Sequence, residues 1–208
     1  MRLAREDYRH ALERLSAEVA ANIEIIDRDI PEIEATLTTA NRGLDALRSC
    51  DNTEANREAI NAGLIQIRGT GGMRLRTRAL REMATNPAIL AQQSDAEREH
   101  FSALLDYTDL FAEELRFYEQ HPLTQRVEDI PILSIGDLRT TSFTYFGVDY
   151  QVQRRPMTLT VPINQACRNT ELTAAFFTWT RWQGNIPVLA LQAQREMEAT
   201  QAFIVQRR

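Results

Sequence analysis

Three groups of residues in this sequence have types and spacings that could support chemistry. The first is Glu97-Arg98-Glu99-His100, which contains Glu-x-x-His. On a helix this spacing places a carboxylate and an imidazole on one face, as in the di-iron sites of four-helix bundles. Such a site needs a second copy of the motif and two further glutamates, and the sequence contains no second copy. We therefore interpret this motif as part of a solvated helix face.

The second group is a run of arginines around a glycine-rich turn, Gly69-Thr70-Gly71-Gly72. Five arginines and no acid occur between residues 68 and 81: Arg68, Arg74, Arg76, Arg78 and Arg81. A glycine-rich turn that opens a helix can bind phosphate, and guanidinium groups favour this, although the turn lacks the lysine and spacing of a P-loop. A helix predicted nearby, over 95–119, holds eight acids and two arginines. The sequence therefore predicts either a patch for an anion or partner, or ion pairing within the chain.

The third group is the two cysteines, Cys50 and Cys167. Neither belongs to a Cys-x-x-Cys or Cys/His cluster with zinc-site spacing, and nothing near them in sequence supports a Cys/His nucleophile pair. We therefore expect no metal site, no cofactor and no catalytic residue, and a non-enzymatic protein. Whether the cysteines form a disulfide depends on the elements that carry them.

The first of these elements is a long helix predicted over 3–49. From Tyr8 to Leu47 the apolar residues recur at steps of three and four, which is a heptad seam with one stutter at Val19. Pro31 lies inside this pattern and does not change its phase. We therefore expect one helix with a kink at Pro31.

A second long helix is predicted over 168–206, because apolar residues from Leu172 to Ile204 keep helical spacing. Pro187 lies inside it and again leaves the phase unchanged, so a kink is expected there too. The aromatic residues near its start are expected to pack in the core against Leu44 and Leu47, and a ligand pocket is the alternative; they are Phe176, Phe177, Trp179 and Trp182.

If the two long helices pack antiparallel, Cys50 lies beside Cys167. Nineteen residues separate Cys50 from Pro31, and twenty separate Cys167 from Pro187, so we expect the two prolines to lie level and form one shared bend. A disulfide between Cys50 and Cys167 can then form if their Cα atoms approach within about 7 Å. The alternative is two unrelated thiols.

Shorter elements fill the middle of the chain. Helices are predicted over about 54–67 and 73–84, and a third follows Ser94-Asp95-Ala96-Glu97, which matches the capping-box pattern, and ends near residue 120. Between 121 and 165 proline, glycine, β-branched and aromatic residues indicate a non-helical or small β insertion. Because loops on a rigid scaffold often carry function, we expect any specific binding surface there. An enzyme with its site near Asp137, Arg139 or Tyr145 is a further alternative.

The composition is that of a folded globular protein. The 208 residues include 24 basic ones, all arginine, and 29 acids, for a net charge of −5. This acidic balance argues against a general nucleic-acid binder, and no apolar run is long enough to cross a membrane. The N-terminus enters a charged helix rather than an apolar signal sequence, so the chain as given is expected to be soluble.

Two stretches of the sequence resemble a family of uncharacterised bacterial proteins. They are Glu18-Val19-Ala20-Ala21-Asn22-Ile23-Glu24-Ile25-Ile26-Asp27-Arg28-Asp29-Ile30 on the first helix and Cys167-Arg168-Asn169-Thr170-Glu171-Leu172 at the start of the last. Members of that family have one N-terminal transmembrane helix, followed by a helical extracytoplasmic domain. The resemblance implies that this chain is the soluble part alone, with the cysteine end distal from the membrane. It also implies an oxidising periplasm, which would favour the disulfide.

Together these patterns predict a single, mostly α domain over 1–208, an elongated antiparallel helical bundle with the insertion at 121–165. The function expected is a sensor, scaffold or interaction domain on the periplasmic side of the inner membrane, with a protein partner or self-association and no nucleic acid. The alternative is a coiled-coil structural subunit of a larger cytosolic assembly, which would contain free thiols.

Overall fold

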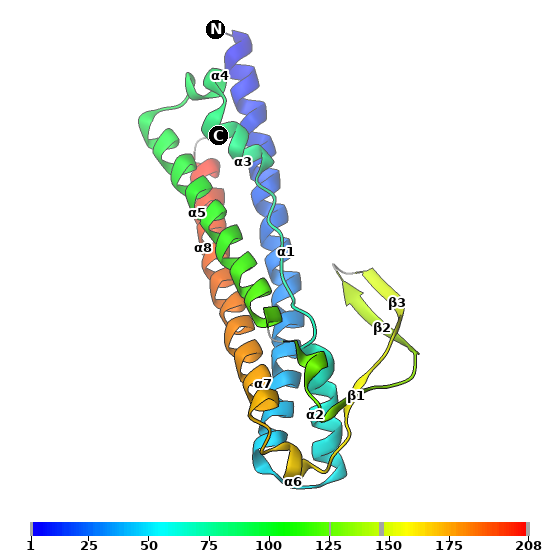
Figure 1. The fold of residues 1–208 in the computed structure, drawn as a ribbon. Helices are drawn as coiled ribbons and strands as arrows, with labels where there is room; N and C mark the ends of the chain where they lie inside the picture. Colours follow the sequence, from blue (N-terminus) through cyan, green and yellow to red (C-terminus); the bar gives the residue numbers. More distant parts are fainter. Residues whose placement is uncertain (1, 125, 146–147, 207–208) are drawn as a thin grey trace. The chain divides into compact units, whose positions relative to one another are not determined.

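The computed structural model confirms a mostly α-helical fold with a pair of long bent helices (Figure 1). It describes the backbone of residues 2–124, 126–145 and 148–206, and side chains over these ranges except residues 2–5, 123–124 and 143–145. Within this part of the chain, no helix is long and apolar enough to cross a membrane. The elements group into two compact units, which are described separately: a first unit of 1–28, 73–116 and 188–208, and a second unit of 29–72 and 117–187.

The long helices follow the predicted ranges closely. Helix α1 covers Arg2–Ser49 and continues through Pro31 without a break. The helix predicted over 168–206 is two consecutive helices, α7 (Thr170–Gln183) and α8 (Asn185–Val205), which are separated at Gly184. Pro187 therefore lies in the first turn of α8, where the backbone N–H that proline lacks would have no helical partner in any case.

The first unit packs the N-terminal part of α1 with α3 (Arg78–Thr85), α4 (Pro87–Leu90), most of α5 (Asp95–Gln120) and most of α8. Helices α1 and α8 run antiparallel in this unit, since Ser16 contacts Gln201 and Asp27 accepts a hydrogen bond from Gln194. Apolar residues of α1, α3, α5 and α8 form its core, including Leu15, Val19, Leu80, Met83, Phe101, Leu104, Met197 and Ile204.

Local signals explain how α5 and α3 begin. The predicted capping box at the start of α5 is confirmed: the backbone N–H of Ser94 donates to the Glu97 carboxylate at 2.7 Å, and the backbone N–H of Glu97 donates to Ser94 Oγ at 3.3 Å. The prediction of a helix from residue 73 is wrong, because α3 begins only at Arg78. Residues 73–78 alternate between inward-facing and exposed positions, a two-residue period typical of extended chain.

The second unit contains the C-terminal part of α1, α2 (Glu54–Gln66), α6 (Ile163–Ala166) and α7. Thr53 caps α2, accepting a hydrogen bond from the backbone N–H of Asn56. Helices α1 and α2 approach closely where Gly43 meets Gly63, and the ring of Phe176 fills the space beside both glycines. Phe176 and Trp179 pack with Leu44 and Leu47, which confirms the core position predicted for these two aromatic residues.

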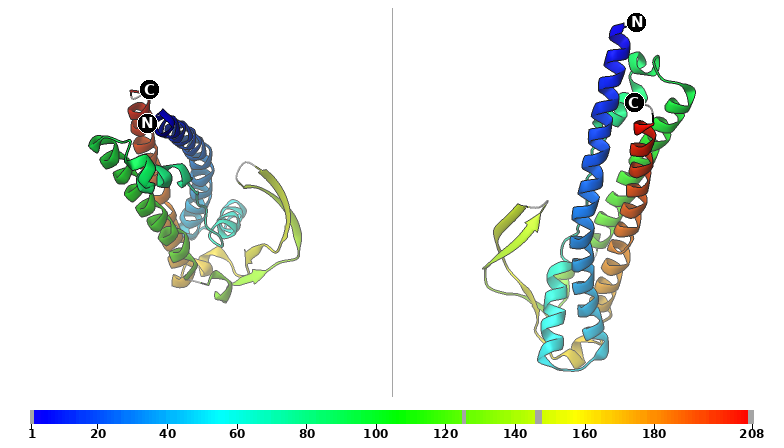
Figure 2. Two further views of the ribbon diagram at one scale, coloured as in Figure 1. Left: turned by 90° about the horizontal axis from the view of Figure 1, so that it is seen from above. Right: turned by 180° about the vertical axis from the view of Figure 1, so that it is seen from behind.

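The 121–165 region is a small β insertion, as predicted. After the short 3₁₀ turns His121–Thr124 and Val127–Asp129, strand β1 (Leu133–Ile135) pairs antiparallel with β4 (Met157–Leu159). Between them, β2 (Arg139–Tyr145) pairs antiparallel with β3 (Val148–Arg154). The β1–β4 pair packs on α2, since the Leu159 backbone N–H donates to Asn61 and Arg57 donates to the Leu159 and Val161 carbonyls. The β2–β3 hairpin lies apart from α2 in the views of Figures 1 and 2.

Candidate functional site

The β2–β3 hairpin has two chemically different faces. Its register pairs Thr141 with Val152, Phe143 with Tyr150, and Tyr145 with Val148, so these alternate positions share one face. The positions between them are Thr140, Ser142, Thr144, Asp149, Gln151 and Gln153, which belong to the other, polar face. We call the first three pairs the apolar row of the hairpin; the pair Arg139–Arg154 ends the same face at the root of the hairpin. This alternation of apolar and polar positions is typical of strands that bury one face.

The apolar row faces solvent where its side chains are described. Val148 and Tyr150 are 52% and 43% exposed, and Val152 is half-buried. A two-stranded hairpin is marginally stable by itself, and apolar side chains normally gather on a strand face because something covers it. The hairpin therefore has the sequence pattern of a covered strand pair but exposes that face. The side chain of Tyr145, a candidate in the enzyme alternative, lies outside the described residues.

The root of the hairpin is fastened by arginines. Arg68 follows α2 and donates to the Arg155 carbonyl at 2.9 Å, and it also forms an ion pair with Glu128 at 3.7 Å. Arg155 in turn donates to the Gly136 carbonyl at 3.2 Å. Arg68 therefore has a structural role at the base of the insertion.

The remaining arginines of the run belong to the first unit and have different partners. Arg81 forms an ion pair with Asp109 of α5 at 2.7 Å, as the pairing alternative predicts. Arg74 donates to the carbonyl of Met73. Arg76 and Arg78 are exposed, and among the residues that the structure describes neither guanidinium has an ion pair. The run of five is thus divided, and an anion patch reduces to Arg76 and Arg78.

The glycine-rich turn at residues 69–72 does not open a helix. The backbone N–H of Gly71 donates to Gln183 Oε1 at 3.1 Å, and Trp179 Nε1 donates to the Gly69 carbonyl at 2.7 Å. Extended chain follows the turn, so no helix N-terminus adjoins it. Side chains of α7 therefore bind two backbone groups of this turn, and the turn does not open a helix, as the phosphate-binding interpretation requires.

Two side chains of α1 bind the backbone around Arg76 and the start of α3 at Arg78. Asn22 is 1% exposed; its Nδ2 donates to the Arg76 carbonyl and its Oδ1 accepts from the Arg76 backbone N–H, both at 2.8 Å. One turn earlier on α1, the Glu18 carboxylate accepts hydrogen bonds from the backbone N–H groups of Ala79 and Leu80, both at 2.9 Å. Glu18 thereby caps α3, whose N-cap residue Thr77 makes no side-chain capping bond.

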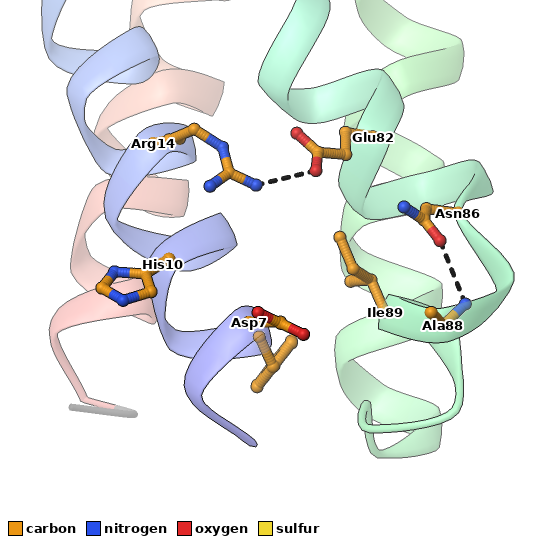
Figure 3. Close-up of a pocket in the computed structure, with 8 residues that line it drawn as sticks. Asp7, His10, Arg14, Glu82, Asn86, Ala88 and Ile89 are labelled. Carbon is orange, nitrogen blue, oxygen red and sulfur yellow. Dashed lines mark hydrogen bonds and ion pairs between the residues drawn. The ribbon is translucent and has the colours of Figure 1, made fainter. Parts of the chain in front are cut away.

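A shallow groove of about 510 Å³ lies between α1 and α3, next to these arginines. We call it the arginine groove; its lining residues are Arg14, Ala17, Glu18, Arg76, Arg78, Ala79 and Glu82. A neighbouring hollow of about 370 Å³, drawn in Figure 3, shares Arg14 and Glu82 with it. In Figure 3 these two side chains point toward one another from α1 and α3, and their ion pair measures 2.7 Å.

The cysteines predicted as a possible pair form a disulfide. The sulfurs of Cys50 and Cys167 are 2.07 Å apart and the Cα atoms 5.4 Å apart. Cys50 has a φ of 57°, in the left-handed region, at the position where the chain leaves α1. A residue in this conformation commonly ends a helix. The disulfide joins the turn between α1 and α2 to the residues just before α7.

The aromatic residues of α7 divide between the core and the surface. Phe177 is exposed, and Trp182 is half-buried and contacts Phe117, Tyr118 and His121 with ring-centroid distances of 4.8 to 5.8 Å. Arg181 lies 5.3 Å from the Trp182 ring centroid, within the range of a cation–π contact. Stacking with α5 and the following turn therefore accounts for Trp182 without a ligand.

Glu97 and His100 have structural contacts. Glu97 is 7% exposed and accepts a hydrogen bond from the Tyr8 hydroxyl in addition to its capping bonds. The prediction that this residue lies on a solvated helix face is therefore wrong. His100 stacks on Phe203 at 4.3 Å, and its Nε2 lies 3.1 Å from Thr200 Oγ1. Burial lowers the pKa of His100, although the charge of Glu196 acts in the opposite direction. Within the described chain, no group of three His, Cys, Asp or Glu is placed to hold a metal ion.

Glu18 and Asn22 are the residues of this region that sequence reasoning missed. A signal existed for Asn22, because Val19, Asn22 and Ile26 have helical spacing and all three are buried, so a polar residue interrupts the buried stripe. Comparison with known proteins gives no further assignment: no family model, no curated protein and no solved structure matches this chain.

Proposed function

We propose that this chain is a non-enzymatic interaction domain, a sensor or scaffold, that binds a partner protein through the β2–β3 hairpin. The observation that carries this proposal is the apolar row, which places Val148 and Tyr150 in solvent. Covering this row would bury apolar area and would also shield the outer backbone edges of a two-stranded sheet. Both effects favour a protein surface as the partner.

Several acidic and histidine side chains that could act in catalysis instead make contacts that stabilise the fold. This supports a binding role over catalysis. Glu18 caps α3, Glu97 caps α5 and His100 stacks in the first unit. The hairpin has the opposite character, since its apolar row faces solvent. Binding is therefore the role that its chemistry suits best.

We further propose that the domain works in an oxidising compartment, as the extracytoplasmic part of a membrane-anchored bacterial protein. The Cys50–Cys167 disulfide supports this location, because disulfides persist in the periplasm and are rare in the cytosol. Thiol titration of the protein purified under non-reducing conditions, with alkylation at lysis, distinguishes the two settings. Two free thiols would favour the cytosolic assembly subunit instead.

The test of the hairpin interface is face-specific photo-cross-linking in cells of the source organism. A photoreactive phenylalanine replaces Tyr150, on the apolar row, or Gln151, which neighbours it on the polar face and is also exposed to solvent. We expect a discrete adduct from position 150 and none from position 151. Mass spectrometry of the adduct identifies a foreign protein or a second copy of this chain.

Adducts of equal yield from both positions, or from neither, would contradict the proposal. The double variant V148T/Y150T gives an independent check, since the hairpin side chains it alters are exposed and the fold should survive. It should keep the melting temperature of the unmodified protein and lose any adduct formed from a photoreactive residue at Val152.

A further inference from the structure

A second site, independent of the hairpin, lies in the first unit. Residues 73–77 lead into α3, which begins at Arg78; Met73 and Leu75 are directed inward, and Arg74, Arg76 and Arg78 are exposed. Arg76 lies in this segment and Arg78 is the first residue of α3, and both line the arginine groove.

The backbone of these two arginines is held in place from α1. The buried Asn22 binds both backbone polar groups of Arg76, and Glu18 binds the two N–H groups that follow Arg78. A fixed backbone reduces the conformational entropy that a binding side chain loses. The segment therefore presents two guanidinium groups from a pre-organised support.

Positively charged side chains outnumber negatively charged ones in the arginine groove, where three arginines lie with two glutamates. Glu82 forms its ion pair with Arg14, and both oxygens of Glu18 accept backbone hydrogen bonds of α3. Arg76 and Arg78 have no ion pair within the described chain. Guanidinium groups match the geometry of phosphate and carboxylate oxygens and bind them through paired N–H donors.

We propose that the arginine groove binds the phosphate or carboxylate group of a small soluble ligand through Arg76 and Arg78. Its volume of about 510 Å³ is in the range of small-ligand sites. An extended polyanion is disfavoured, because Glu18 and Glu82 flank the two arginines and the whole chain carries a net charge of −5. The ligand thus places one anionic group between the guanidiniums.

The experiment is an NMR titration of the arginine Nε–Hε signals in the full chain, at constant ionic strength. One arm uses inorganic phosphate and the other uses acetate, so that the two oxyanion classes are compared. We expect saturable shifts of the Arg76 and Arg78 signals with a Kd in the millimolar range or tighter. The anion with the lower Kd is the preferred class.

Matched variants decide whether the binding is specific. R76Q/R78Q should weaken the Kd at least about tenfold. R42Q/R195Q makes the same charge change at two exposed arginines outside the groove and should leave the Kd unchanged. Circular dichroism confirms that both variants are folded. Shifts that never saturate, or a loss of affinity that is equal in both variants, would overturn the site.

Discussion

At the scale of single residues, Asn22 shows how a buried polar group can organise its surroundings. It lies in the apolar stripe of α1 with 1% of its surface exposed, and its amide binds the carbonyl and the N–H of Arg76. A buried amide is tolerated in a core only when it is hydrogen-bonded, and here the partner is an otherwise unpaired stretch of backbone. Asn22 therefore determines where the extended segment meets the helix.

We expect Asn22→Ala to lower the free energy of unfolding by about 1 to 3 kcal/mol, because two backbone groups of Arg76 lose their partner. Urea denaturation followed by circular dichroism measures this change. Asn41→Ala is the control, since Asn41 is exposed on the same helix and its replacement should change stability by less than about 0.5 kcal/mol. Equal losses in both variants would show that Asn22 does not hold the segment.

His100 connects a single side chain to the pH dependence of stability. Burial lowers its pKa in the folded state below the ordinary value of 6.5. Above that pH the imidazole is neutral in both states and contributes no pH dependence. Below it, the unfolded chain binds the proton more readily than the folded protein, so stability must fall as the pH is lowered.

We therefore expect the free energy of unfolding to decrease as the pH falls below 6.5, until the folded protein also protonates His100. The measurement is urea denaturation at a series of pH values between 7.5 and 5, a range chosen around that pKa. His100→Gln should flatten the slope, whereas His10→Gln, at an exposed position, should keep it. An unchanged slope in His100→Gln would remove His100 as its source.

At the scale of elements, the α1–α2 contact depends on two glycines. A Cβ added to Gly63 would lie 2.6 Å from the ring carbon Cε1 of Phe176 and 3.3 Å from the Gly43 Cα. These helices therefore approach closely only because both positions lack a side chain. The sequence motif is inconspicuous, since single glycines within helices usually reduce stability.

We expect Gly63→Ala to destabilise the protein by about 1 to 3 kcal/mol, because the methyl group overpacks the interface with Phe176 and α1. Gly69→Ala serves as the control, since its Cβ would have no neighbour within 4 Å. Thermal unfolding compares the two variants. If Gly63→Ala raises the melting temperature, the gain in helix propensity outweighs the clash and the close contact is not required.

The insertion shows where element prediction was strong and where it was weak. The β-branched and aromatic residues predicted a non-helical or small β insertion over 121–165, and the hairpin shows that it is the β alternative. The helix predicted from residue 73 begins only at Arg78, because the hydrogen bonds from Asn22 to the Arg76 backbone and the burial of Met73 hold the preceding residues outside the helix. The interruption at Gly184, rather than at Pro187, was missed because the apolar phase is continuous across both.

At the scale of the whole molecule, the disulfide closes most of the chain into one loop. The two cysteines are 117 residues apart in sequence, and they join the turn after α1 to the turn before α7. In the second unit Gly43 also approaches Phe176, so α1 and α7 run antiparallel from the disulfide. That direction is compatible with the predicted level position of Pro31 and Pro187, which stays a prediction.

Removing the disulfide should cost about 4 to 5 kcal/mol of unfolding free energy, since the open chain regains the entropy of a loop of more than a hundred residues. The variant C50S/C167S and the wild-type protein under reducing conditions should show the same loss in urea denaturation. The oxidised wild type provides the reference. A loss below about 1 kcal/mol in both would contradict the stabilising role that chain entropy assigns to this cross-link.

The sequence by itself determined the mostly helical content, the long first helix, the helical character of the C-terminal region, the cap of α5 and the position of the non-helical insertion. These features depend on local propensity and on periodicity within one segment, which a sequence displays directly. Only the tertiary structure decided which arginines have partners, because Arg68, Arg81, Arg76 and Arg78 differ in what other elements bring beside them. The roles of Glu18 and Asn22 depend likewise on backbone groups more than fifty residues away, and no pattern within a single helix encodes those contacts.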